Sequence, residues 1–147
     1  MRTRPATAAD IPAMMALEQH SVTAAHWPSH QYEVAFGGTA RRMALALEES
    51  GELQAFLIAR SVGGEWELEN IAVSGPARRR GLGSRLLGEF LDHIRTEGGK
   101  AIFLEVRESN HAARALYEKW AFEACGRRLK YCRQPEEDAI TYRLDLV

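Results

Sequence analysis

The stretch LENIAVSGPARRRGLGSRLL, residues 68–87, joins a predicted strand to a predicted helix through a turn rich in arginine and glycine. In residues 65–73, alternation places Trp66, Leu68 and Asn70 on one face of the strand and Ile71 and Val73 on the other. Downstream of the turn, apolar residues recur at helical spacing: Leu82, Leu86, Leu87, Phe90, Leu91 and Ile94. Because an apolar strand follows at residues 101–106, the stretch predicts a βαβ crossover.

The segments on either side of this crossover predict an α/β fold with a mixed sheet. The expected strands cover residues 1–5, 41–50, 53–62, 65–73, 101–106, 121–129 and 138–147. The expected helices are one at 7–21, a short one within 25–36 that Ser29 could cap, one from Leu82 that ends before Gly98, and one at 109–120 with Ser109 or Asn110 as its cap. The order is strand, two helices, three strands, helix, strand, helix and two strands. Because no linker or repeat interrupts it, we expect one domain over residues 1–147.

The composition is that of an ordinary globular protein. Of the 147 residues, 46% are hydrophobic, and 19 basic against 20 acidic side chains give a net charge of −1. This balance predicts neither a nucleic acid nor a membrane as a direct partner, and no apolar stretch is long enough to span a bilayer. The first residues show no signal-peptide pattern, so we expect a cytoplasmic protein with Cys125 and Cys132 as free thiols. The histidines lack metal-ligand spacing, so we expect no metal.

The turn at residues 78–84 predicts a phosphate-binding site. A helix N-terminus offers N–H groups and a partial positive charge, and glycine lets an oxygen approach the backbone closely. Arg78, Arg79 and Arg80 add positive potential. The Walker P-loop pattern is absent, and the third glycine of the Rossmann pattern is replaced by Leu86. On this motif alone, a solvated basic helix cap is the alternative.

The pattern Arg78-x-x-Gly81-x-Gly83, placed between a strand and a helix, resembles the pyrophosphate loop of the GNAT superfamily of N-acetyltransferases. Together with NIAV (70–73) and LEVRESNHAARALYEKWAF (104–122), it resembles the RimI-type ribosomal-protein-alanine N-acetyltransferases over essentially the whole chain. The resemblance implies the fold of that superfamily, an acyltransferase activity and acetyl-CoA as the co-substrate.

The same resemblance implies roles for individual residues. Glu105 would be the general base, Tyr117 the general acid, and Asn110 a hydrogen-bond partner of the pantetheine arm. The backbone that pairs with this arm, like an added strand, would be that of Ile71, Ala72 and Val73. The pyrophosphate would be held by the turn, mainly through backbone amides from Arg79 onward, so that the cofactor-binding set includes Arg78, Arg79, Arg80, Gly81, Leu82, Gly83 and Ser84.

The chemistry of amine acylation gives independent reasons for a carboxylate and a tyrosine. An α-amino group titrates near ~8, so a modest base can prepare it for attack. A tyrosine hydroxyl can supply the proton that the departing thiolate needs. Other interpretations stay open, because Glu105 could face water or pair with Arg107, and Tyr117 could pack beside Ala113 and Leu116.

Two regions are expected to select the acceptor. Trp27 and Pro28 resemble a Trp/Pro pair of the RimI type, and Tyr131 matches one of two adjacent tyrosines, the other being replaced by Lys130. We expect direct attack by a protein N-terminal α-amine, with the N-terminal alanine of a ribosomal protein as the first candidate, in an enzyme that is a monomer or weak dimer. A lysine or small amine as acceptor, or a non-catalytic acyl-CoA-binding regulatory role, are alternatives. The acidic residues at 136–138 could face a cationic acceptor or form a solvated turn.

Overall fold

The computed structural model describes residues 1–20, 26–75, 81–132 and 136–146, and it confirms the expected order of elements. The strands are β1 (Arg2–Pro5), β2 (Arg42–Glu49), β3 (Glu52–Val62), β4 (Glu65–Val73), β5 (Ala101–Arg107), β6 (Glu123–Cys132) and β7 (Glu137–Asp145). The helices are α1 (Ile11–Glu18), α2 (Ser29–Gly37), α3 (Leu82–Thr96) and α4 (His111–Lys119), and a short 3₁₀ turn at Ala8–Asp10 precedes α1.

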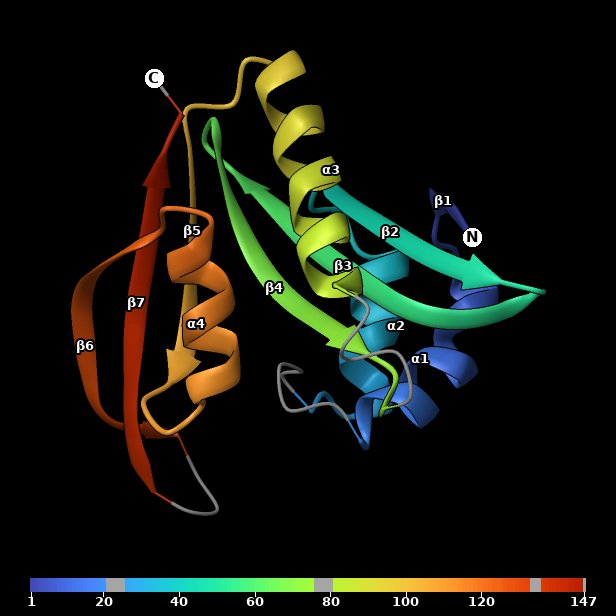
Figure 1. The fold of residues 1–147 in the computed structure, drawn as a ribbon, viewed down its shortest axis with the longest axis horizontal. Coiled ribbons are helices and arrows are strands. Elements are labelled where there is room, and N and C mark those ends of the chain that lie inside the picture. Colours follow the sequence, from blue (N-terminus) through green and yellow to red (C-terminus); the bar gives the residue numbers. More distant parts are fainter. Residues whose placement is uncertain (21–25, 76–80, 133–135, 147) are drawn as a thin grey trace.

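One mixed sheet contains these strands in the order β1-β2-β3-β4-β5-β7-β6. β4 and β5 are parallel, because α3 carries the chain back between them, whereas the other neighbours are antiparallel. The ladder between β4 and β5 consists of Trp66 with Ile102 and Glu67 with Phe103. Beyond these pairs β4 follows β3 and β5 follows β7, so the two strands diverge, as Figure 1 shows.

The joined end of β4 and β5 is reinforced by contacts outside their ladder. Lys100 N donates to the Gly64 carbonyl at 3.0 Å, which ties the start of β5 to the β3–β4 turn. Arg143 of β7 reaches past β5 to Glu65 of β4, with its two terminal nitrogens 3.1 and 2.6 Å from the carboxylate oxygens. The two halves of the sheet are therefore pinned at one end and separate at the other.

Helices cover both faces of the sheet, and each face has its own apolar core. On one face α3 and α4 pack on the strands, and α3 contributes Leu82, Leu86, Leu87, Phe90, Leu91 and Ile94. On the other face, the cluster under α1 and α2 contains Met14, Leu17, Tyr32, Ala35, Phe56, Ile58 and Ala72. The second cluster lies on β2, β3 and β4, so α1 and α2 cover the sheet on the β4 side of the break.

A β-bulge in β4 changes which side chains share a face. Ile58 of β3 pairs with Asn70, but the next residue, Ala59, pairs with Leu68, so Glu69 is the extra residue. The expected grouping of Asn70 with Trp66 and Leu68 is therefore wrong. The Asn70 side chain faces α1, where it donates to Glu18, because a strict two-residue period cannot accommodate an inserted residue.

The structure corrects the expected starts or ends of some elements, and it decides between the two expected caps of α4. α2 begins at Ser29 with Pro28 in the N-cap position, so the expected Ser29 cap is wrong. Asn110, and not Ser109, caps α4, and its Oδ1 accepts a hydrogen bond from Ala113 N at 3.1 Å. β6 extends past residue 129 to Cys132, because its pairing with β7 resumes after a register shift that includes Lys130 at a φ of 53°.

One indole links α3 to α4. Trp120 Nε1 donates to Ser84 Oγ at 2.8 Å, and a Cβ added to Gly88 would lie 2.9 Å from Cη2 of Trp120. Gly88 is therefore required by the close approach of the ring, not by its backbone conformation.

We expect Gly88→Val to lower the thermal midpoint, because its side chain would push Trp120 off α3 and break the bond to Ser84. Overpacking of this kind costs about 1–3 kcal/mol. Gly37→Ala is the matched control, since a Cβ at Gly37 meets open space and alanine favours the helix. Thermal melts with tryptophan fluorescence test the pair, and equal melting of Gly88→Val and the unmodified protein would contradict the packing role.

Candidate active site

The residues expected to form a site gather where β4 and β5 diverge. Both α3 and α4 begin at this end of the sheet, α3 downstream of β4 and α4 downstream of β5 (Figure 1). In parallel α/β units, ligands bind beyond the carboxyl ends of the strands, where helix N-termini carry a partial positive charge. The break in the sheet thus brings two helix starts to one place.

The turn before α3 needs glycine at two positions for different reasons. Gly81 has a φ of 71°, a left-handed conformation that side chains with a Cβ rarely adopt. At Gly83, a Cβ would lie 3.4 Å from Val73 Cγ2, so a larger group would crowd the end of β4. The expected ligands Arg78, Arg79 and Arg80 lie outside the described residues.

The first turn of α3 offers its backbone to a ligand. The Leu82 side chain is buried in the core, and Ser84 Oγ accepts the hydrogen bond from Trp120. The hydrogen bond from Arg85 N to the Gly81 carbonyl, at 3.0 Å, opens the helix ladder. The N–H groups of Leu82, Gly83 and Ser84 precede it, at positions for which a helix provides no acceptor.

The side chains at the end of β4 are packed in the two apolar cores. Ile71 and Val73 belong to the core under α3 and α4, and Ala72 belongs to the core under α1 and α2. A molecule between β4 and β5 would therefore meet the backbone of these residues. Asn110 lies at the start of α4, where its Oδ1 holds the helix cap.

Glu105 lies on β5 beside this break. Ile102 and Leu104 point into the α3–α4 core, so strand alternation directs Glu105 to the face that carries α1 and α2. Arg128 Nε of β6 lies 3.0 Å from Glu105 Oε2, whereas Arg107 pairs with Glu137 at 3.1 Å. The contact with Arg128 lacks hydrogen-bond geometry, and among the described residues no donor forms a hydrogen bond with the buried Oε2.

Tyr117 lies on α4, under the opposite face. Its ring contacts those of Phe122 and Tyr142, with centroids 5.8 and 6.2 Å apart, so the packing interpretation is confirmed. Burial raises the pKa of Tyr117 above its ordinary value of 10.0, so the hydroxyl keeps its proton at physiological pH. Packing and proton donation are therefore compatible.

A buried carboxylate anchors the segment that contains Trp27. Glu18 is 4% exposed, and its Oε1 accepts hydrogen bonds from Asn70 Nδ2 at 2.8 Å and from Trp27 N at 2.9 Å. The Trp27 ring packs edge-on against Tyr32 at 5.2 Å. Burial and the charge of Glu18 raise the pKa of Tyr32, so that hydroxyl stays a donor. This network links the expected acceptor segment to β4.

The β6–β7 hairpin is tied to the end of β5 by charged groups. Glu137 Oε1 accepts hydrogen bonds from Ser109 Oγ at 2.9 Å and Arg107 Nη1 at 3.1 Å, and these donors lower the pKa of Glu137. Asp138 Oδ1 accepts from Lys130 N at 2.9 Å, and this bond, with a second from Arg127, lowers the pKa of Asp138. These acidic groups therefore hold the hairpin itself.

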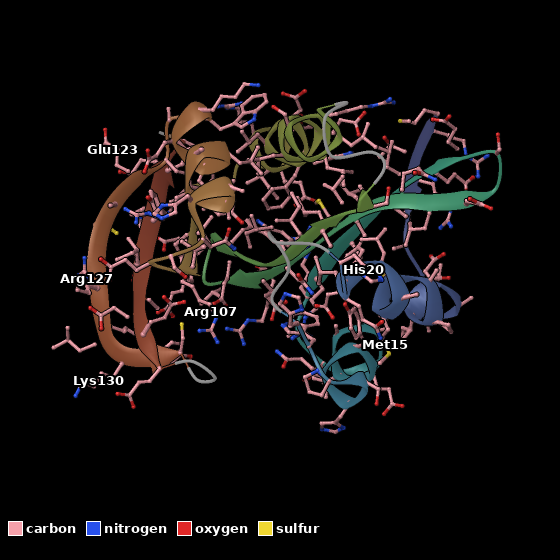
Figure 2. All side chains as sticks on the ribbon, turned by 60° about the horizontal axis from the view of Figure 1, so that its bottom comes forward. Met15, His20, Arg107, Glu123, Arg127 and Lys130 are labelled. Carbon is pink, nitrogen blue, oxygen red and sulfur yellow. The ribbon has the colours of Figure 1, made fainter. Side chains whose placement is uncertain are left out.

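Tyr131 lies near the end of β6, and Arg107 lies at the end of β5. Tyr131 is about half exposed, and the Arg128 guanidinium carbon lies 4.7 Å from its ring centroid. Figure 2 shows Arg107 in the region between the β6–β7 hairpin and helices α1 and α2, with Arg127 and Lys130 along the outer side of β6.

Sequence reasoning missed two residues of this region, Glu18 and Arg128. Glu18 follows Met14 by four residues on the buried face of α1, and that spacing was a signal of burial. No local pattern marks Arg128, because its contact with Glu105 joins strands far apart in the sequence.

Within the described ranges, no group of three or more His, Cys, Asp or Glu side chains could hold a metal ion. No helix in these ranges is long and apolar enough to cross a membrane.

The chain is similar in sequence to known proteins of one family. The profile of the Acetyltransferase (GNAT) family matches residues 11–122. The [Ribosomal protein bS18]-alanine N-acetyltransferase of Salmonella typhimurium is 40% identical to this chain over 140 residues, which is 93% of this chain and 92% of that protein.

Solved structures share the fold over nearly the whole chain. The crystal structure of the ribosomal-protein-S18-alanine N-acetyltransferase from Escherichia coli has a TM-score of 0.84 and 32% identity, covering 99% of this chain and 93% of that one. Arabidopsis thaliana NAA60 in complex with acetyl-CoA has a TM-score of 0.84 and 16% identity, covering 99% and 98%. The second likeness concerns the fold alone.

The charged hairpin gives a pH prediction. Hydrogen bonds from Ser109 and Lys130 lower the pKa values of Glu137 and Asp138 from their ordinary 4.5 and 3.8. The ionised carboxylates therefore stabilise the hairpin at pH values above these ordinary pKa values. The contribution is lost as pH falls through the lowered values. We expect the protection factor of the Lys130 amide to be high near neutral pH and to collapse in acid. In Asp138→Asn, which keeps an acceptor oxygen but cannot titrate, protection should depend much less on pH. Hydrogen exchange measures both, and acid-resistant protection in the unmodified chain would contradict the assignment.

Proposed function

The chain belongs to the acetyltransferase (GNAT) family and is an acyltransferase, and on that premise we propose that it moves the acetyl group of acetyl-CoA to a protein N-terminal α-amine. The first candidate acceptor is the N-terminal alanine of ribosomal protein bS18, the acceptor in the names of relatives that are 37–40% identical over 93% of the chain. The observation that carries the proposal is the β4–β5 break, with two helix starts and Glu105 beside it.

The break suits a long, partly extended co-substrate. The pantetheine arm would lie along the backbone of Ile71–Val73 as an added strand. Its pyrophosphate would meet the first amides of α3 and the turn from Arg78 to Ser84, where a helix N-terminus favours anions. Asn110, at the start of α4, would hydrogen-bond the arm. A protein of the same fold has been solved with acetyl-CoA, which supports this placement.

The proposed reaction needs no covalent enzyme intermediate. Glu105 takes a proton from the acceptor ammonium, directly or through water, and the freed nitrogen lone pair attacks the thioester carbonyl carbon. The carbon–sulfur bond then breaks, and Tyr117 gives its proton to the departing thiolate. As the amide forms, the nitrogen loses its second proton through water to the Tyr117 oxygen, and Glu105 releases its proton to solvent before the next turnover. Glu105 and Tyr117 lie under opposite faces of the sheet, and in this proposal a thioester bound in the break would meet groups from both faces.

The acceptor end would be formed by Trp27 and Tyr131. Trp27 is fixed by the Glu18–Asn70 network, and Tyr131 is fixed by the Arg128 stack on the hairpin. A peptide N-terminus that enters between these aromatic side chains would approach Glu105 from the α1–α2 face.

A substrate panel tests the function. Acetyl-CoA is offered with a peptide that begins with free alanine, the same peptide with a blocked N-terminus and an internal lysine, and a small primary amine. We expect transfer to the free N-terminus, located by mass spectrometry. Transfer to the lysine or the small amine instead would sink the N-terminal assignment, and no transfer to any acceptor would favour a binding role.

We expect Gly83→Asp to weaken acetyl-CoA binding by roughly tenfold or more, because a carboxylate would repel the pyrophosphate at short range. Gly83→Ala is the matched control, since its Cβ makes only van der Waals contact with Val73 and adds no charge. Titration calorimetry measures both variants. Unchanged affinity in Gly83→Asp would remove this turn from the cofactor site.

For the chemical step, we expect Glu105→Gln to bind acetyl-CoA normally but to lose turnover by roughly 10²–10⁴-fold, the usual worth of a general base. The deficit should shrink at high pH, where the amine is already neutral. Tyr117→Phe should lower turnover more than acetyl-CoA affinity, because the hydroxyl is needed late in the reaction. Rates at several pH values are compared with thermal melts. Full activity per folded molecule in Glu105→Gln would exclude it as the base.

A further inference from the structure

Arg128 contacts Glu105, the proposed general base of the reaction. Arg128 Nε lies 3.0 Å from Glu105 Oε2, and this oxygen is buried although the Glu105 side chain as a whole is 21% exposed. A buried carboxylate oxygen has given up its hydration and is normally compensated by hydrogen bonds. Here the nearby cation supplies the compensation through its charge rather than through an aligned bond.

The position of Arg128 is set by the bulge in β6. Arg128 and Tyr131 are three residues apart, and in a regular strand they would point to opposite faces. The register shift between Arg128 and Cys132, with Lys130 in a left-handed conformation, brings the guanidinium over the Tyr131 ring at 4.7 Å. Asp138 fixes this kink by accepting the hydrogen bond from Lys130 N. The Arg128 guanidinium, which lies beside Glu105, is thus also held by the Tyr131 ring.

We propose that Arg128 is a positioning residue that holds the Glu105 carboxylate in place and opposes the binding of a protonated acceptor beside it, an inference that rests on the proposed role of Glu105 as the base. A cation within about 4–6 Å of an ammonium group disfavours the charged form of that group. An acceptor bound next to Glu105 therefore meets the guanidinium charge of Arg128, which favours its neutral amine form. The step moves one proton from nitrogen to oxygen and needs no further reactant.

Other charged groups around Glu105 have partners of their own. Arg107 on β5 pairs with Glu137 on β7, and the Glu67 and Glu69 carboxylates of β4 pair with Arg60 at 2.7 Å and Arg42 at 2.9 Å. On the α1 side, Glu18 is hydrogen-bonded by Asn70 and Trp27. Burial raises the pKa of Cys132, whose thiol also senses the charges of Arg107 and Glu105. Among these groups, Arg128 is the cation in contact with Glu105.

Arg127 provides a matched control for Arg128. It is the preceding residue on the same strand, it has the same side chain, and it pairs with Glu108 at 2.7 Å and Asp138 at 2.6 Å instead of Glu105. The Arg128 side chain is 57% exposed, and exposed ion pairs contribute little to stability. Replacing either arginine should therefore leave a folded protein.

The experiment compares pH–rate profiles of the unmodified enzyme, Arg128→Gln, Arg128→Lys and Arg127→Gln, with a free N-terminal alanine peptide and acetyl-CoA. In Arg128→Gln we expect the acid limb to move to higher pH, with roughly a tenfold loss of kcat/KM on that limb. The loss should be in kcat, while the peptide KM stays the same or falls. Arg128→Lys keeps a cation and should restore most of the acid limb, and Arg127→Gln should leave it in place.

The outcomes separate this inference from the function on which it rests. If Glu105→Gln is inactive and Arg128→Gln keeps the unmodified acid limb, the positioning role is overturned and the base assignment stands. If Glu105→Gln is fully active, both are overturned. A purely structural role would lower the thermal midpoint of Arg128→Gln without moving the limb. Should Arg128→Gln fail to fold, Tyr131→Leu removes the stack instead, and an unmoved acid limb there would overturn the inference.

Discussion

The two-pair ladder between β4 and β5 is the constraint on which the rest of the structure depends. Four strands on one side and three on the other are each held by antiparallel pairing, so the sheet tolerates a break between them. The joined end is pinned by the Arg143–Glu65 ion pair and by the Lys100–Gly64 hydrogen bond. Since both helices after the parallel strands begin at the open end, backbone amides of α3 and the cap of α4 lie beside the break.

Local pattern was sufficient for the elements whose side chains repeat regularly. The apolar spacing from Leu82 to Ile94 predicted α3, and the hairpin glycines at 63 and 64 separated β3 from β4. The Glu69 bulge was not predictable, because an inserted residue leaves the composition of a strand unchanged while it turns Asn70 to the other face. The predicted end of β6, at residue 129, was too early for a related reason: Lys130 interrupts the pairing with β7 without ending it.

The residues of the candidate site likewise fall into two groups: those marked by short sequence motifs, and those whose partners are distant in the sequence. Short sequence motifs contain Gly81, Gly83, Asn110 and Glu105. In the structure these residues lie near the end of the sheet where β4 and β5 diverge. The partner of Glu105 comes from a strand that is far away in sequence, and so does the Asn70 that holds Glu18. Sequence spacing can propose a carboxylate as a base, but the cation that lies beside it follows only from the order of β5, β7 and β6.

The exposed outer strand of the sheet has a further consequence for the behaviour of the protein in a crowded solution. β6 is an edge strand of ten residues, and a long, flat edge is a template on which other chains can add strands. The left-handed backbone at Lys130 breaks that edge, and the charged side chains of Arg127 and Arg128 on the same strand are held in ion pairs. The same kink that orders the hairpin thus shortens the surface on which aggregation could begin.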